Sequence, residues 1–183
     1  MFEAKPLAMG TNHMLGVDNY VPLMQQNFEV RIYDNNGDVS GNQYDYLTLS
    51  TDTIGAVTYN QEVIEVHYGN GIIKFPNKAT PGNVNWTLNC FCEPNVLDTL
   101  RDWLKLSYDP ETEKMGLPSQ YMKQVYFIKY DGQGNVRDVI WCPGTWIHNL
   151  NNGEMQQNGG LVKVSVEFVI SRAIYQKVDS VFR

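Results

Sequence analysis

The stretch Val84–Asp109, VNWTLNCFCEPNVLDTLRDWLKLSYD, changes its hydrophobic period halfway along, and this change decides the fold. Up to residue 92 apolar and polar side chains alternate, which is typical of a strand with one buried face. From Pro94 onward the apolar side chains recur every three or four positions, which predicts one apolar stripe on a helix. We therefore expect a strand followed directly by a helix over about 94–107.

The apolar stripe of this helix needs an apolar surface to cover it, so we expect the helix to lie on a sheet. Burial contributes roughly 1.5–3 kcal/mol for each large apolar side chain. The residues expected at this contact are Trp86, Leu97, Leu100, Trp103 and Leu104. No other stretch has comparable helical spacing, and we expect no second helix.

Most of the remaining chain has the pattern of strands. Asn27–Asp34 and Gln61–Tyr68 alternate apolar and polar residues, and Leu161–Ser171 has the clearest alternation of all. Gln43–Ser50, rich in Tyr and Leu, is β-like as well. Gln124–Cys142 predicts two strands joined by a glycine-containing turn.

Glycine, proline and small polar residues separate these strands. Pro76–Gly82 and Pro110–Ser119 are predicted to be loops, and Asn35–Asp38 is predicted to be a turn. Pro143-Gly144 is expected to break a strand, and Thr51–Thr58 is small and polar without a buried period.

The length of 183 residues suits a single domain spanning 1–183, in which residues 1–26 form an irregular N-terminal arm. Many antiparallel strands and one helix predict a mainly β fold. We expect an antiparallel β-sandwich or open barrel with one flanking helix.

The net charge of −6 and the pI of about 5.0 argue against nucleic-acid binding, which needs basic residues to neutralise phosphates. Only 19% of the residues are charged, and a surface rich in uncharged polar groups suits protein–protein contact. No apolar run is long enough to span a membrane, and the N-terminus lacks a signal-peptide pattern. The three cysteines are expected to be reduced thiols.

We considered several chemical sites and found no catalytic signature. Cys90 and Cys92 have half the spacing of a metal site, but Cys142, His67 and His148 are scattered, which favours core thiols. A glycosidase needs two facing carboxylates, and nothing selects a pair among Glu62, Glu65, Glu154 and Glu167. We expect no enzyme, metal or cofactor.

The glycine-containing turn at Gly132–Asn135 and the aspartates beside it have two interpretations each. Gly132–Asn135 resembles a phosphate-binding loop, but a strand follows it, which favours a hairpin turn. Asp131 and Asp138 beside it are expected to be solvated carboxylates and not calcium ligands.

The large aromatic side chains are consistent with three roles: a sugar platform, interface anchors or core residues. These side chains are Tyr44, Tyr46, Tyr59, Trp141 and Trp146.

Four stretches follow one another from Asn27 onward in a specific order and spacing. They are NFEVRIY, then TDTIGAVTYNQEVIEVHYGNGIIKFPNKATPGNVNWTLNC, then VLDTLRDWLKL, and finally GTWIHNLNNGEMQQNGGLVKVSVEFVISRAIY. In this order and spacing the chain resembles the tail-tube proteins of contractile-tailed bacteriophages of the T-even type.

The resemblance implies a structural virion protein, assembled in the host cytoplasm, whose hexameric rings stack into a hollow tube. It further implies that the sheets join into an inner β-barrel, that sheath and baseplate proteins contact the tube, and that DNA passes through without specific binding. Alternatives are a baseplate tube initiator, the tube protein of an injection system and, from another class, a β-sandwich carbohydrate-binding module. A small hydrolase is the remaining alternative.

In this interpretation two groups of residues are expected at the assembly surfaces. Ring-to-ring contacts are expected at Asn35–Asp38 and within Thr51–Thr58, chiefly at Asp52, Thr53, Ile54 and Gly55. A channel that lets DNA slide should have a net charge of zero or below. The candidate lining residues are Glu29, Arg31, Glu62, Glu65, Lys163, Ser165 and Glu167.

Overall fold

The computed structural model describes residues 25–34, 44–91, 95–153 and 160–176. The strands are β1 (Phe28–Tyr33), β2 (Thr51–Ile54), β3 (Tyr59–Tyr68), β4 (Gly71–Pro81), β5 (Val84–Asn89), β6 (Tyr108–Asp109), β7 (Lys114–Met115), β8 (Lys123–Tyr130), β9 (Val136–Asn151), β10 (Lys163–Ile170) and β11 (Ile174–Gln176). The helices are α2 (Asp45–Leu49), α3 (Val96–Ser107) and α4 (Pro118–Tyr121).

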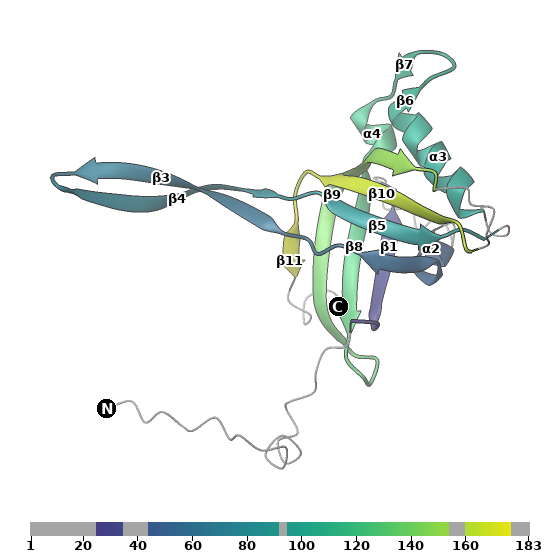
Figure 1. Ribbon diagram of the computed structural model, residues 1–183, viewed down its shortest axis with the longest axis horizontal. Coiled ribbons are helices and arrows are strands. Elements are labelled where there is room, and N and C mark those ends of the chain that lie inside the picture. Colours follow the sequence, from purple (N-terminus) through teal and green to yellow (C-terminus); the bar gives the residue numbers. More distant parts are fainter. Residues whose placement is uncertain (1–24, 35–43, 92–94, 154–159, 177–183) are drawn as a thin grey trace, which may run out of the picture.

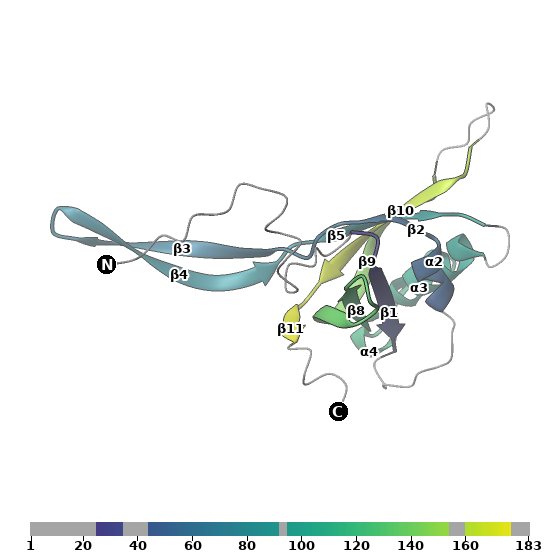
Figure 2. The ribbon, with the colours of Figure 1, turned by 90° about the horizontal axis from the view of Figure 1, so that it is seen from below.

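One antiparallel sheet forms the body of the molecule. Its strand order is β1-β8-β9-β10-β5-β2, and β11 pairs with the first part of β9. The sheet bends so that β1 and β8 run across the direction of β5 and β10 (Figures 1 and 2). The mainly β, antiparallel fold that the sequence predicts is therefore confirmed, and the described strands form no closed barrel.

Strand β9 is long enough to belong to both halves of the bent sheet. It pairs with β8 up to Thr145 and with β10 from Thr145 onward. The predicted break at Pro143-Gly144 is wrong, because the strand continues there through a shift in register. A bulge accommodates proline, which has no N–H to donate, and Gly144 adopts a φ of 71° that favours glycine.

The core lies between the two halves of the sheet and helix α3. Trp86 and Leu100 are fully buried, and the ring of Trp103 lies 5.4 Å from that of Phe168. The indole N–H of Trp103 donates to the carbonyl oxygen of Tyr121 at 2.8 Å, which satisfies its one polar atom. Leu97 and Leu104 are partly buried at the margin of the same cluster.

Helix α3 begins at Val96, after Asn95, whose side chain accepts the backbone N–H of Asp98 at 3.2 Å. The expected helical residue Pro94 and the thiol of Cys92 lie outside the described residues, as do the predicted arm up to residue 24 and the Asn35–Asp38 turn. None of the described helices has the length and apolarity that a membrane crossing requires.

Three predicted segments differ in the structure. Gln43–Ser50 contains helix α2 and no strand, because Leu47 is buried in the core while Thr48 reaches β1. Pro110–Ser119 is not all loop, since it contains β7 and the start of α4, and the expectation of a single helix is wrong. Most of Pro76–Gly82 extends β4, because a strand without a third neighbour tolerates proline.

Candidate assembly surfaces

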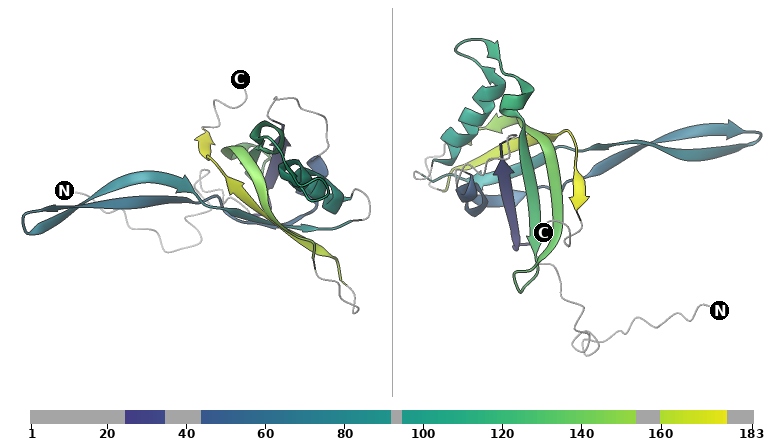
Figure 3. Two further views of the ribbon diagram at one scale, coloured as in Figure 1. Left: turned by 90° about the horizontal axis from the view of Figure 1, so that it is seen from above. Right: turned by 180° about the vertical axis from the view of Figure 1, so that it is seen from behind.

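The β3–β4 hairpin, which we call the hairpin arm, extends far from the body (Figures 1 and 3). Strand β2 leads into β3, and β4 leads into β5, so the arm prolongs two strands of the body sheet. A ten-residue strand spans roughly 33 Å. Every residue of β3, and all of β4 except Pro81, is exposed.

The two faces of the hairpin arm differ in chemistry. Directly paired residues share a face, and the pairs Ile64–Phe75 and Val66–Ile73 make one face apolar. Each of these four side chains keeps 44–49% of its surface exposed. Among the described residues, no element covers this apolar face of the two-stranded ribbon.

The opposite face of the arm is mixed. It contains Glu65, which pairs with Lys74 at 2.8 Å, and His67 opposite Ile72. The charges of Glu65 and Lys74 cancel, so this expected lining residue adds no net charge. Glu62 lies two residues before Ile64 and therefore on the side of the apolar face, where it accepts a hydrogen bond from the side-chain amide of Asn77 at 3.2 Å.

A second surface is the side of β5, β10 and the end of β9 that faces away from the core, which we call the polar sheet face. In Figure 2 the helices and strands β1 and β8 lie on the other side of these strands. The register brings together mostly uncharged side chains here: Thr53, Asn85, Thr87, Asn89, Asn149, Asn151, Lys163, Ser165 and Glu167.

The few charged side chains on the polar sheet face form ion pairs or hydrogen bonds with neighbouring residues. Lys163 pairs with Asp52 at 2.9 Å, across the intervening strand β5. Glu167 accepts a hydrogen bond from the side-chain amide of Asn83 at 2.8 Å. The charged side chains here are Lys163, Asp52 and Glu167. This surface therefore has a slight negative charge and no basic cluster.

The structure separates the expected lining residues into three places. Lys163, Ser165 and Glu167 lie together on the polar sheet face, whereas Glu65 lies on the hairpin arm and Glu29 and Arg31 lie on β1. Asn149 and Asn151 also lie on this face but were not among the expected lining residues, although their alternation in HNLN is the signal that could have placed them.

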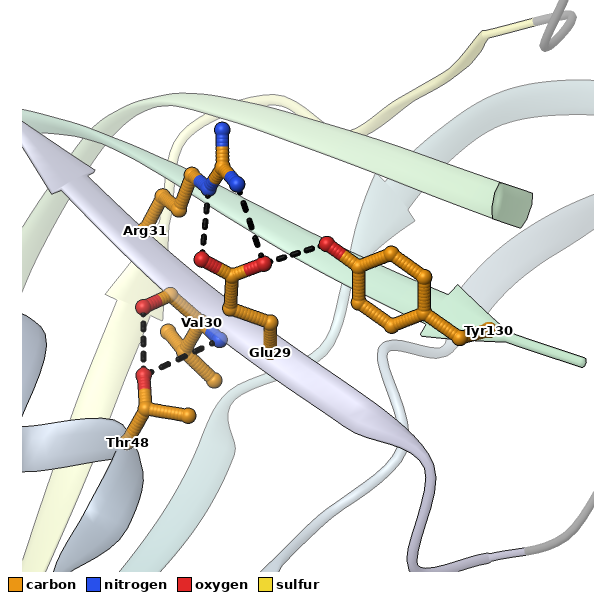
Figure 4. Close-up of polar contacts among 5 residues, drawn as sticks. All are labelled: Glu29, Val30, Arg31, Thr48 and Tyr130. Carbon is orange, nitrogen blue, oxygen red and sulfur yellow. Dashed lines mark hydrogen bonds and ion pairs between the residues drawn. The ribbon is translucent and has the colours of Figure 1, made fainter. Parts of the chain in front are cut away.

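Figure 4 shows the polar cluster around β1. The guanidinium of Arg31 donates to both carboxylate oxygens of Glu29, at 2.6 and 3.1 Å, and the hydroxyl of Tyr130 donates to the same carboxylate. Burial raises the pKa of Glu29, but these hydrogen bonds outweigh burial and lower the pKa overall. The charges of Arg31 and Glu29 cancel within this cluster, so it contributes no net charge.

The two edges of the body sheet differ. At the β1 edge the hydroxyl of Thr48 accepts from the N–H of Val30 at 3.3 Å and donates to its carbonyl at 2.8 Å (Figure 4). Helix α2 thus satisfies the backbone groups that a neighbouring strand would otherwise bind. At the β2 edge, which contains Asp52, Thr53 and Ile54, no described strand pairs with the outer side. Gly55 follows this edge and donates its N–H to the carbonyl of Asn85 at 2.7 Å.

The residues considered for chemistry are not brought together. Cys142 is buried in the core, and burial raises the pKa of its thiol to about 12, so the thiolate is disfavoured. Cys90 lies just after β5, His67 lies on the hairpin arm, and His148 contacts the ring of Trp146. Among the described residues no three potential ligands are grouped as a metal site would require.

The interpretation of Asp131 as a solvated turn carboxylate is wrong. Its side chain is 5% exposed and accepts the backbone N–H groups of Asn135 at 2.8 Å and Gln133 at 2.9 Å. Arg137 pairs with the same carboxylate at 2.9 Å. The bond from Asn135 is the main cause that lowers the pKa of Asp131 to about 2. Asp138 instead pairs with Lys129 at 3.2 Å.

The large aromatic side chains do not form one platform. The ring of Tyr44 lies 6.3 Å from that of Trp103, whereas Trp141 stacks on Tyr126 at 6.2 Å. Three other pairs are spread over different elements: Tyr46 with Thr99, Tyr59 with Tyr175, and Trp146 with Tyr121. This dispersion does not favour a sugar-binding surface.

Comparisons with solved structures agree with this architecture. A chain of the sheath-tube complex of the PVC extracellular contractile injection system is 14% identical with a TM-score of 0.64, covering 92% of this chain and 99% of that one. A chain of the tube-terminating cap of the anti-feeding prophage is 13% identical with a TM-score of 0.66, covering 88% and 95%. The SPP1 tail tube is 12% identical with a TM-score of 0.58, covering 84% and 78%.

The fold is therefore that of tail-tube subunits, as the sequence resemblance predicts. These similar structures are parts of tubes and injection particles and not enzymes. No family model matches the chain, and no curated protein does so either.

Proposed function

We propose that this protein is the structural subunit of a hollow tail tube in a phage or injection particle. The observation that supports this most is the hairpin arm, whose apolar face is exposed in the subunit and needs a partner. Six copies form a ring, rings stack, and the arm of one copy is covered by another copy. The role is non-enzymatic and needs no cofactor.

In the proposed tube the polar sheet face lines the channel. Its Asn, Thr and Ser side chains and its slight negative charge suit a surface over which DNA slides without binding, since phosphate affinity requires basic residues. The side of the molecule with helix α3 then faces outward, toward a surrounding sheath, and the end of the tube meets a baseplate. The particle is assembled in the host cytoplasm.

Neighbouring copies within a ring are proposed to meet at the β2 edge. Asp52–Gly55, which the sequence predicts at ring-to-ring contacts, are here proposed to lie between copies of one ring, because they form the edge of the body sheet with which no described strand pairs. A strand of the next copy would satisfy the outer backbone groups of β2, as Thr48 satisfies those of Val30 at the β1 edge.

A matched pair of variants tests the proposal. Ile73 and Ile72 are neighbours on β4, 47% and 53% exposed, but they lie on opposite faces of the arm. By negative-stain electron microscopy, wild-type protein and Ile72→Asp should form tubes, and Ile73→Asp should remain as folded subunits or single rings. A wild-type protein that never forms rings or tubes at high concentration would refute the proposal.

A further inference from the structure

The base of the hairpin arm lies between two separate ladders of paired strands. Residues 55–58 connect β2 to β3 and residues 82–83 connect β4 to β5, and none of them belongs to a strand. The register of β2 with β5 ends at Ile54, and the register of β3 with β4 begins at Tyr59. A few residues at the ends of elements can absorb a change of backbone direction, so such a junction could act as a hinge.

Backbone hydrogen bonds hold the two connections of the junction side by side. The N–H of Gly82 donates to the carbonyl of Thr58 at 2.8 Å. A Cβ at Gly82 would lie 2.5 Å from the hydroxyl oxygen of Thr58, so a larger residue would force the two connections apart. Val57 packs against the core of the body. These contacts fix where the arm begins, but they lie within the ribbon and do not fix its direction.

Tyr59, the first residue of β3, contacts a part of the body outside the ribbon. Its hydroxyl accepts the backbone N–H of the buried Ala173 at 3.2 Å. Its ring lies 5.8 Å from that of Tyr175. Ala173 directly precedes β11 and Tyr175 belongs to it, and in Figures 1 and 3 β11 lies beside the base of the arm.

Strand β11 connects this contact to the other half of the bent sheet. It pairs with the first part of β9, with Ile174 opposite Trp141 and Gln176 opposite Val139, and the same part of β9 pairs with β8. The arm, in contrast, continues β2 and β5, which lie in the half that contains β10. Tyr59 therefore joins the arm to the half of the sheet from which the arm does not extend.

We propose that Tyr59 is a positioning residue that fixes the direction of the hairpin arm relative to the body, through its contacts with Ala173 and Tyr175. The inference rests on the proposed tube function, because a repeating assembly requires every copy to present the arm in the same way. An arm held in its binding direction also loses less conformational freedom when it meets a second copy.

The expected effect is on the direction of the arm and not on the fold of the body. Tyr59 is 38% exposed, so truncating it opens no cavity in the core. A hydrogen bond of this kind shifts an equilibrium constant by roughly two- to tenfold, and an aromatic pair adds a similar factor. Loss of both should leave the arm free to change direction for much of the time.

Residual dipolar couplings of the backbone amides test this directly, because they report the direction of one segment relative to another. They are measured on folded subunits, kept from polymerising by Ile73→Asp. In this background the arm and the body should fit one alignment tensor. With Tyr59→Leu the couplings of the arm should fall by about half or more relative to those of the body, and with Tyr59→Phe, which keeps the ring, they should fall less.

Tyr68→Leu is the matched control. Tyr68 is a 78% exposed tyrosine at the far end of the same strand, so its loss should leave the arm couplings at their original size. Arm couplings that stay unchanged in Tyr59→Leu would overturn the inference, since the junction alone would then fix the arm. If Tyr59→Leu does not fold, Tyr175→Ala repeats the test from the side of β11.

Polymerisation tests the consequence for assembly. Tyr59→Leu without the Ile73→Asp change should raise the protein concentration needed for tube formation by about two- to tenfold. An unchanged threshold together with reduced couplings would contradict the role of arm direction in stacking. A wild-type protein that forms no tubes would refute the proposed function, but the couplings would still decide the role of Tyr59, because they are measured on single subunits.

Discussion

The hairpin arm continues two strands of the body sheet, β2 and β5, yet among the described residues only the body covers its apolar face. In the body, Trp86 and Val166 alternate with polar neighbours and are buried. In the arm, Val66 alternates with polar neighbours in the same way and is about half exposed. Alternation thus predicts a strand with one apolar face, without indicating whether the same chain covers that face.

Substituting an apolar side chain should therefore lower the free energy of unfolding by very different amounts in the body and in the arm. The largest effect is expected for Trp103→Ala, which should lower the free energy of unfolding by about 3–5 kcal/mol because it empties the space beside Phe168. Chemical denaturation measures this loss. Leu106→Ala on the same helix, where the side chain is 42% exposed, is the control and should cost much less. Equal losses for the two would mean that helix α3 is not part of the core.

An intermediate effect is expected at the covered edge of the body. Thr48→Val keeps the shape of the side chain but removes the hydroxyl, so the N–H and C=O of Val30 lose their partner. Leaving such groups unsatisfied should cost about 1–3 kcal/mol. Thr48→Ser retains the hydroxyl and should stay close to wild type in thermal and urea unfolding. If Thr48→Ser and Thr48→Val were equally destabilised, the edge hydrogen bonds would not matter.

The smallest effect on the subunit is expected in the hairpin arm. Val66→Ser, measured in the Ile73→Asp background so that no polymer forms, should change the free energy of unfolding by within about 0.5 kcal/mol, as exposed substitutions do. The same substitution in the otherwise wild-type chain should weaken tube formation. A loss above about 1.5 kcal/mol in the isolated subunit would show that the arm packs on its own body.

Patterns that depend on local chemistry were predictable. The switch from a period of two to a period near four places β5 and α3 correctly, because the buried faces of both elements meet in one core. The alternation of Lys163, Ser165 and Glu167 places them on one face of β10, away from the core.

Features that depend on neighbours were not predictable. The prolines of β4 indicate a loop, but a strand without a third neighbour has no need of their missing N–H groups. Helix α2 contains the β-favouring residues Tyr46 and Thr48, and the burial of Leu47 decides its conformation. Asp131 is a common turn residue whose burial depends on Arg137 and on the closure of its own turn.

The direct passage of β2 into β3 and of β4 into β5 has a mechanical consequence. A force that pulls the arm along its length enters the body through two covalent backbones and not through a hinge. The hydrogen bonds between β5 and β10 lie perpendicular to these antiparallel strands, so such a pull loads that ladder in shear, with many bonds resisting at once. A stack joined by the arm, as proposed above, would resist stretching far better than the separation of β3 from β4 starting at the Gly69–Gly71 turn.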